Sequence, residues 1–129
     1  MSRRAYVAVV DDERQGRTAL NRLLRLANYD TAVFASGEAF LDSIAARRPE
    51  CVVLDVHMPG LSGFDVQARL ESAQVDVAVI FITASDAPDL ERIALAAGGV
   101  RLLRKPFSND DLLAAVDAAL RSKSSDASN

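Results

Sequence analysis

The sequence has little of what would mark a secreted, membrane-bound or nucleic-acid-binding protein. Its single cysteine, Cys51, excludes an internal disulfide and suits a reducing compartment. No hydrophobic run approaches the ~20 residues of a membrane-spanning helix, and the first segment, MSRRAYVAVVDDE, has too few apolar residues for a signal peptide. The net charge is −3, so no basic excess indicates contact with nucleic acid. We therefore expect a cytoplasmic protein that binds neither membrane nor nucleic acid.

The 129 residues suit one domain with a single substantial core, since half of them are hydrophobic and 26% are charged. We expect this domain to cover residues 1–122. The segment 123–129 is polar and is expected to be a disordered tail or the start of a linker. The chain contains no internal repeat.

Short apolar runs alternate with amphipathic segments along the chain. The predicted strands cover residues 6–10, 30–34, 51–55, 77–83 and 100–104. The predicted helices begin near Asp12, after an N-cap at Ser36, near Ser62, near Pro88 and after an N-cap at Ser108. Five strands alternating with five helices predict an α/β fold, a doubly wound five-stranded parallel sheet in a three-layer sandwich.

Charged and polar residues gather where the predicted strands end. These residues are Asp11, Asp12, Asp55, Thr83 and Lys105, and Ala84 directly follows Thr83. The carboxyl ends of parallel strands share one edge of a sheet, which is where ligands bind in this class of fold, so we expect these residues to converge. Convergent carboxylates repel one another and favour a bound cation, and carboxylate and carbonyl oxygens are the ligands of Mg²⁺ (or Mn²⁺).

The same residues suit phosphoryl transfer. A lysine ammonium and a threonine hydroxyl supply a positive charge and a hydrogen-bond donor for a phosphoryl group. An aspartate can attack phosphorus, and Asp55, the acid that ends an apolar strand, is the candidate nucleophile. Taken singly, these residues have ordinary explanations, such as a helix cap for Asp11 and Asp12 or packing for Cys51. Their joint placement at the ends of four strands favours a site.

Four motifs, VAVVDDE, LDVHMPGLSGFD, FITAS and LLRKPF, resemble the receiver domain of bacterial response regulators. Together they span nearly the whole chain. The resemblance implies a flavodoxin-like (βα)₅ domain that takes a phosphoryl group from a histidine kinase or a phosphotransfer protein onto Asp55. Such a domain is a switch in two-component signalling and not an enzyme, because it catalyses only its own phosphorylation and dephosphorylation.

The resemblance also assigns roles to the other site residues. The implied metal ligands are Asp12, Asp55 and the main-chain carbonyl of His57, with Asp11 acting through water. The implied phosphoryl ligands are Thr83, Ala84 and Lys105. The bond between Lys105 and Pro106 is expected to be a cis peptide, which only an X-Pro bond adopts at low cost. The last two helices and the fifth strand are expected to form the surface for a second copy or an effector.

Two positions depart from the family pattern. Three residues before the lysine, the family usually carries an aromatic ring that changes rotamer together with the threonine, and here Leu102 stands. Thr83 and Leu102 are therefore the switch positions, but without the ring we expect the loop 84–89 to carry the change. His57 occupies the second position after the phosphoacceptor, where the family tunes the lifetime of the acyl phosphate.

The same pattern leaves three alternative functions to consider. A haloacid-dehalogenase-type phosphatase needs a second acid two residues after its nucleophile, where His57 stands, and an insertion that binds substrate. A flavin-binding, flavodoxin-like module needs a phosphate loop after the first strand, but DDERQG places acids there that repel phosphate. A receiver-like domain that is never phosphorylated is disfavoured because every site residue is present.

Overall fold

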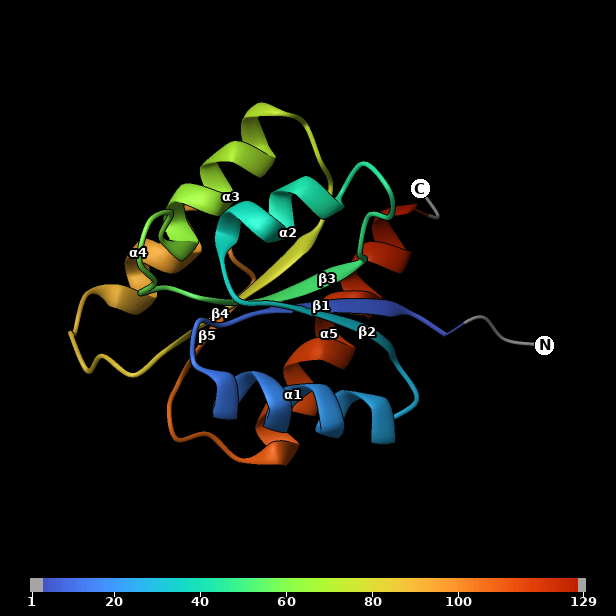
Figure 1. Ribbon diagram of the computed structural model, residues 1–129, viewed down its shortest axis with the longest axis horizontal. Helices are drawn as coiled ribbons and strands as arrows, with labels where there is room; N and C mark the ends of the chain where they lie inside the picture. Colours follow the sequence, from blue (N-terminus) through green and yellow to red (C-terminus); the bar gives the residue numbers. More distant parts are fainter. Residues whose placement is uncertain (1–3, 128–129) are drawn as a thin grey trace.

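The computed structural model describes residues 4–127, with the backbone alone described for residues 123–127. Five parallel strands form one sheet in the order β2-β1-β3-β4-β5, with helices on both faces (Figure 1). The strands are β1 (Tyr6–Val10), β2 (Asp30–Phe34), β3 (Cys51–Asp55), β4 (Ala78–Thr83) and β5 (Arg101–Arg104). The helices are α1 (Arg14–Leu26), α2 (Gly37–Ser43), α3 (Gly63–Ser72), α4 (Leu90–Ala96) and α5 (Asn109–Ala127). The predicted α/β sandwich is confirmed.

Alternate residues of each central strand enter two separate cores. In β1, Val7 and Val9 pack with α1 and α5, whereas Ala8 and Val10 pack with α2, α3 and α4. All five residues of β3 are buried, as expected of a parallel strand covered on both faces. This two-sided burial explains why the three central strands, β1, β3 and β4, read as continuous apolar runs and not as alternating ones.

Local side-chain caps set the starts of three helices. Ser36 accepts a hydrogen bond from the Ala39 N–H at 3.1 Å, and Ser108 accepts one from the Asp111 N–H at 3.0 Å, so both predicted N-caps are confirmed. Ser62 forms a reciprocal capping box with Asp65 at the start of α3. These contacts join residues three apart, which is why the sequence was enough to predict the caps at Ser36 and Ser108.

Three element boundaries differ from the sequence prediction by one or two residues. Strands β4 and β5 each begin one residue later than predicted. Helix α1 begins at Arg14, because the Asp11 carboxylate accepts the Glu13 N–H at 2.9 Å and holds residues 11–13 in a turn before the helix. Helix α4 ends at Ala96, and Gly98 follows it with a φ of +104° that favours glycine.

The end of the chain differs more. Helix α5 continues to Ala127, so the backbone of residues 123–127 is helical, and the disordered tail predicted from their composition stays a prediction. Extending an existing helix fixes one residue for each added hydrogen bond, which is much easier than starting a new helix. Residues 128–129 lie outside the described part, and a linker beginning in this segment stays a prediction.

Within residues 4–127, no helix is both long enough and apolar enough to span a membrane. This agrees with the absence of long apolar runs in the sequence.

Candidate functional site

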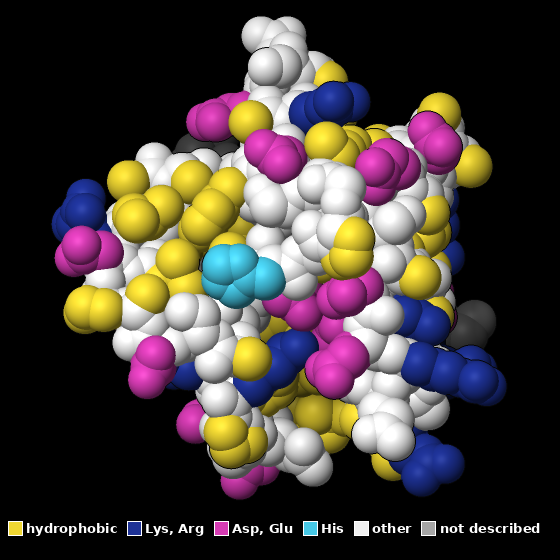
Figure 2. Space-filling model, turned by 60° about the vertical axis from the view of Figure 1, so that its left-hand side comes forward, with side chains coloured by type: hydrophobic (Ala, Val, Ile, Leu, Met, Phe, Trp, Pro, Cys, Tyr) yellow, Lys and Arg dark blue, Asp and Glu magenta, His cyan; other side chains and the backbone are white. Residues whose placement is uncertain are grey.

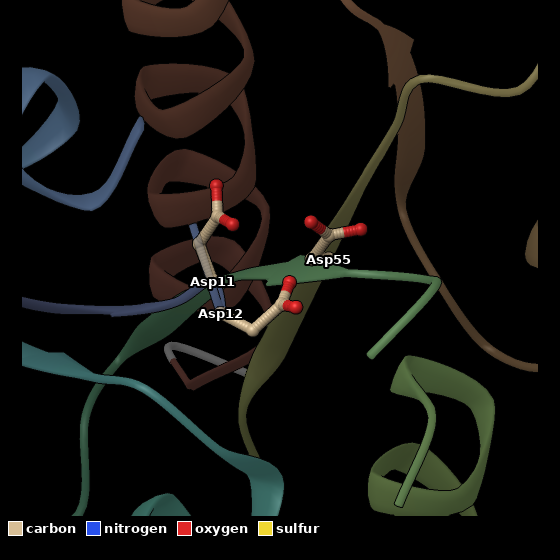
Figure 3. A group of neighbouring side chains, drawn as sticks. All are labelled: Asp11, Asp12 and Asp55. Atoms are coloured by element: carbon tan, nitrogen blue, oxygen red, sulfur yellow. The ribbon is translucent and has the colours of Figure 1, made fainter. Parts of the chain in front are cut away.

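Three carboxylates meet at the carboxyl edge of the sheet. Asp11 and Asp12 follow β1, Asp55 ends β3, and each offers an oxygen that lies within 4.8 Å of the others. Figure 3 shows the three side chains pointing toward one another from these neighbouring strands. Asp11 is fully buried and Asp55 is 6% exposed, whereas Asp12 is exposed. The site is therefore an acidic pocket in which two carboxylates are buried and the third, that of Asp12, is open to solvent.

Backbone N–H groups hold the two buried carboxylates in place. Asp11 accepts from the Glu13 N–H at 2.9 Å, and Asp55 accepts from the His57 N–H at 3.1 Å. Each aspartate thus binds the main chain two residues ahead through one oxygen. The other oxygen of each faces the interior of the site, where Lys105 lies.

Lys105 brings a positive charge into the middle of the acidic cluster. Its Nζ lies 3.2 Å from Asp11 Oδ2 and 3.2 Å from Asp55 Oδ2, with Glu13 Oε1 at 4.0 Å. The Lys105 N–H also donates to the Thr83 carbonyl at 2.7 Å, which fixes the residue against the end of β4. The predicted cis peptide between Lys105 and Pro106 is present. The ammonium thus bridges two acids from different strands.

The electrostatics of the site are shaped by burial and by these charges. Burial raises the pKa of the Asp55 carboxyl, and the negative charge of Asp11 adds to this, although Lys105 and the His57 N–H act in the opposite direction. Burial alone would lower the pKa of Lys105, but Asp55 and Asp11 outweigh it and raise that pKa. When all four groups are ionised, one ammonium faces three carboxylates, so the cluster carries excess negative charge.

This excess fits a hard divalent cation. Asp11, Asp12 and Asp55 offer only oxygen donors, and oxygen donors in this number are what Mg²⁺ and Mn²⁺ bind. Within residues 4–127, the three acids are the one group whose ligand atoms come close enough together to hold a metal ion. The donor set and its charge therefore support the metal site predicted from the sequence.

Of the remaining predicted residues, Thr83, Ala84 and His57 also lie at this edge, whereas Leu102 lies within β5 opposite Phe81. Thr83 is fully buried at the end of β4, and its Oγ1 accepts the Ser85 N–H at 3.0 Å, which leaves the hydroxyl able to donate. Ala84 follows it at the surface. The His57 side chain is exposed, whereas Leu102 is 6% exposed and packs with the core on the α2–α4 side.

Two glycines support the site, and the sequence prediction gave neither of them this role. A Cβ at Gly63, the first residue of α3, would lie 2.4 Å from the Asp55 carbonyl oxygen. A Cβ at Gly16 in α1 would lie 2.8 Å from Asp11 Oδ2. The absence of side chains at these positions lets both helices approach the acidic residues closely. Nothing in the sequence indicates these approaches, because each depends on a contact between separate elements.

Figure 2 shows the acidic side chains gathered in a hollow of the surface, with basic side chains close by and the only histidine above them. The hollow continues as an open cleft of about 340 Å³ between α1 and the segment that follows β5. Asp11, Glu13 and Lys105 line one end of this cleft, and apolar side chains that include Leu20 and Phe107 line the rest. The site is thus accessible from the α1 side.

Comparisons with known proteins agree with this geometry. The model of the family described as "Response regulator receiver domain" matches residues 7–117. The chain is 34% identical over 121 residues to the transcriptional regulatory protein FixJ of Bradyrhizobium diazoefficiens, a match that covers 94% of this chain and 59% of FixJ. It is 42% identical over 121 residues to the response regulator MprA of a Mycobacterium species, covering 93% of this chain and 52% of MprA.

A solved structure supports the same assignment. The crystal structure of a response regulator receiver protein from Burkholderia phymatum superposes with a TM-score of 0.82 at 44% identity, covering 91% of this chain and 95% of that one. The present chain spans little more than half the length of FixJ and MprA. The flavodoxin-like fold, the acids at the strand ends and these similarities have one common explanation: the chain belongs to the family of response regulator receiver domains, the phosphorylation switches of two-component signalling.

Proposed function

We propose that this domain accepts a phosphoryl group on the carboxylate of Asp55. The observation that carries the proposal is the placement of this carboxylate, which is almost fully buried and lies 3.2 Å from the Lys105 ammonium beside Asp11 and Asp12. A carboxylate oxygen of Asp55 would bond to phosphorus while the P–N bond of a donor phosphohistidine breaks and its electron pair stays with the imidazole. Attack of water on the acyl phosphate would later return the carboxylate and release inorganic phosphate.

The acidic residues would hold Mg²⁺, or Mn²⁺ in its place. Asp12, Asp55 and the main-chain carbonyl of His57 would bind directly, and Asp11 would bind through water. A bound ion supplies the positive charge that offsets the repulsion between the anionic nucleophile and the anionic donor. The support for this assignment is the clustering of the three carboxylates around a shared point.

Three residues would bind the new phosphoryl group. Lys105 would pair with one oxygen, since its ammonium already lies beside the Asp55 carboxylate. Thr83 would donate its hydroxyl to another oxygen, and Ala84 would contribute its main chain. In this state the Thr83 hydroxyl would turn away from the Ser85 N–H that it now accepts.

We propose a histidine kinase or a phosphotransfer protein as the donor. The surface made by α4, β5 and α5 would bind a second copy or an effector, and its support is three apolar side chains that remain 40–49% exposed there: Ile93, Leu95 and Val100. We propose that the domain works in the cytoplasm, that this chain itself binds neither nucleic acid nor membrane, and that it does not turn over other substrates.

The two rival functions gain no support from the site. The residue two positions after Asp55 is His57, which cannot act as the carboxylic acid of a haloacid-dehalogenase-type phosphatase. The turn after β1 presents Asp11, Asp12 and Glu13, which would repel the phosphate of a flavin.

Incubation with Mg²⁺ and acetyl phosphate, followed by intact mass measurement, tests the proposed function. We expect a mass gain of one phosphoryl group in the wild type and none in Asp55→Asn. The control is Asp42→Asn, because Asp42 is an exposed acid of α2 outside the site. A phosphoryl gain that survives Asp55→Asn would show that another residue is the acceptor.

A further inference from the structure

The loop between β4 and α4 is exposed along most of its length, yet polar contacts hold it at every second residue. The Ser85 N–H donates to Thr83 Oγ1 at 3.0 Å, and the Ala87 N–H donates to Ser85 Oγ at 3.2 Å. Ala84 and residues 86–89 are exposed, so little apolar burial holds the loop in place. Its position therefore depends mainly on hydrogen bonds.

Arg104, the last residue of β5, binds the carbonyl groups of the same two loop residues. One terminal nitrogen of its guanidinium donates to the Ser85 carbonyl at 2.8 Å, and the other donates to the Ala87 carbonyl at 3.0 Å. The planar, always charged guanidinium suits two such bonds at once, which a lysine ammonium on a flexible stem matches less well. As a result, Ser85 and Ala87 each have both their N–H and their carbonyl bonded.

The two sets of contacts connect the proposed phosphorylation site to β5, the last strand of the sheet. Ser85 is held at its N–H by the Thr83 hydroxyl and at its carbonyl by Arg104. If the hydroxyl turns toward a phosphoryl oxygen, the Ser85 N–H loses its acceptor, and any movement of that peptide strains its bond to Arg104. Arg104 also shares one face of β5 with Leu102, because alternate residues of a strand point to the same side.

We propose that Arg104 is a positioning residue that holds the β4–α4 loop in its unphosphorylated arrangement and couples that loop to β5. The inference rests on the proposed function. It assigns to the Arg104 guanidinium the connection between the loop and β5 that Leu102, which has no aromatic ring, does not provide. Phosphoryl binding at Thr83 would move the Ser85 peptide, whereas the hydrogen bonds from Arg104 hold that peptide in place, so the two interactions oppose each other. Removing the hydrogen bonds from Arg104 therefore favours the loop arrangement that binds a phosphoryl group. The apparent affinity for a phosphoryl mimic should rise, because it depends on the fraction of the protein in that arrangement.

The test compares Arg104→Met with a matched control, Arg101→Met, since Arg101 is exposed on the same strand. The first readout is amide hydrogen exchange over residues 84–90 without ligand. The second is the dissociation constant of beryllofluoride, a phosphoryl mimic, in the presence of Mg²⁺. For Arg104→Met we expect faster exchange and binding that is tighter by about three- to tenfold, the effect of losing a net hydrogen bond. Arg101→Met should match the wild type in both.

Each other outcome has a defined meaning. Unchanged exchange in Arg104→Met shows that the loop is not held by Arg104, and faster exchange with unchanged beryllofluoride affinity reduces Arg104 to a structural role; either result overturns the proposal. A wild type that does not bind beryllofluoride counts against the proposed function and this proposal together. If Arg104→Met does not melt cooperatively, Arg104→Lys, which keeps the charge but not the planar fork, should show the same two effects at smaller size.

Discussion

At the scale of single residues, Asp55 illustrates a conflict between function and stability. The proposed phosphorylation requires its carboxylate to be exposed enough to react, but burial and the neighbouring Asp11 raise its pKa above the ordinary value of 3.8. A raised pKa in the folded state means that the protein is stabilised while Asp55 is protonated and loses that stability as pH rises through the folded pKa. Ionised Asp55 therefore destabilises the metal-free protein, even with Lys105 beside it.

We accordingly expect Asp55→Asn to raise the stability of the metal-free protein at pH 7 by about 0.5–2 kcal/mol, as is common when a strained functional site is relaxed. The gain should disappear below pH 3.8, where Asp55 is protonated in both folded and unfolded chains. Thermal melts in a metal chelator between pH 3 and pH 8 measure this. Asp42→Asn serves as the control, and an Asp55→Asn gain that persists undiminished at the lowest pH contradicts the explanation.

Whereas ionised Asp55 destabilises the metal-free protein, Lys105 stabilises it. Its ammonium separates two buried carboxylates, and its raised pKa shows that these acids favour its charged form. We expect Lys105→Ala to fold and to bind metal, with a lower melting temperature in chelator and a smaller deficit once Mg²⁺ is added. The same variant should bind beryllofluoride more weakly than the wild type. Equal deficits with and without Mg²⁺ would mean that Lys105 stabilises the fold by packing and not by charge.

At the scale of elements, the site depends on how closely α3 approaches β3. Gly63 begins α3 directly against the main chain of Asp55, and its N–H donates to the Val56 carbonyl at 2.9 Å. We expect Gly63→Ala to cost about 1–3 kcal/mol of stability, because the new methyl group meets a backbone oxygen that cannot move aside. Urea unfolding measures the loss. Glu71→Ala, on the exposed side of the same helix, should change stability by under about 0.5 kcal/mol.

The route of the signal is also a property of elements. Leu102 lies in the core without a ring, so we expect beryllofluoride to change amide exchange most in residues 84–90 and less in residues 100–104. The reason is that Thr83 is bonded to this loop through Ser85. Exchange measured on the wild type with and without the mimic decides between the two segments. A dominant change in 100–104 would show that β5 itself carries the signal.

At the scale of the whole molecule, we expect charge repulsion at one sheet edge to make the stability of the fold depend on bound metal. A ligand that binds only the native state raises stability by RT ln(1 + [L]/Kd), which is roughly 2.7 kcal/mol at a hundred times Kd. We therefore expect millimolar Mg²⁺ to raise the melting temperature of the wild type and to have little effect on Asp12→Ala. An unchanged wild-type midpoint, or an equal shift in Asp12→Ala, would argue that the acids do not bind metal.

The sequence by itself determined the features that depend on neighbours in the chain. Apolar runs defined the five strands, and serines 36 and 108 defined two helix starts, because hydrophobic periodicity and capping act over a few residues. The acids at the ends of β1 and β3 were identified for the same reason. The sequence did not define where α5 ends, since composition does not reveal whether an existing helix continues into a polar segment.

Only the tertiary structure decided how these pieces meet. Lys105 lies 50 residues from Asp55 and 94 from Asp11 in the chain, and the strand order brings their side chains to 3.2 Å. The approach of Gly63 to Asp55 and the grip of Arg104 on the β4–α4 loop likewise need the packed sheet. The strand ends alone predicted that Lys105, Asp11 and Asp55 would converge, but which atoms pair and how closely depends on the packing of distant elements, which no local pattern encodes.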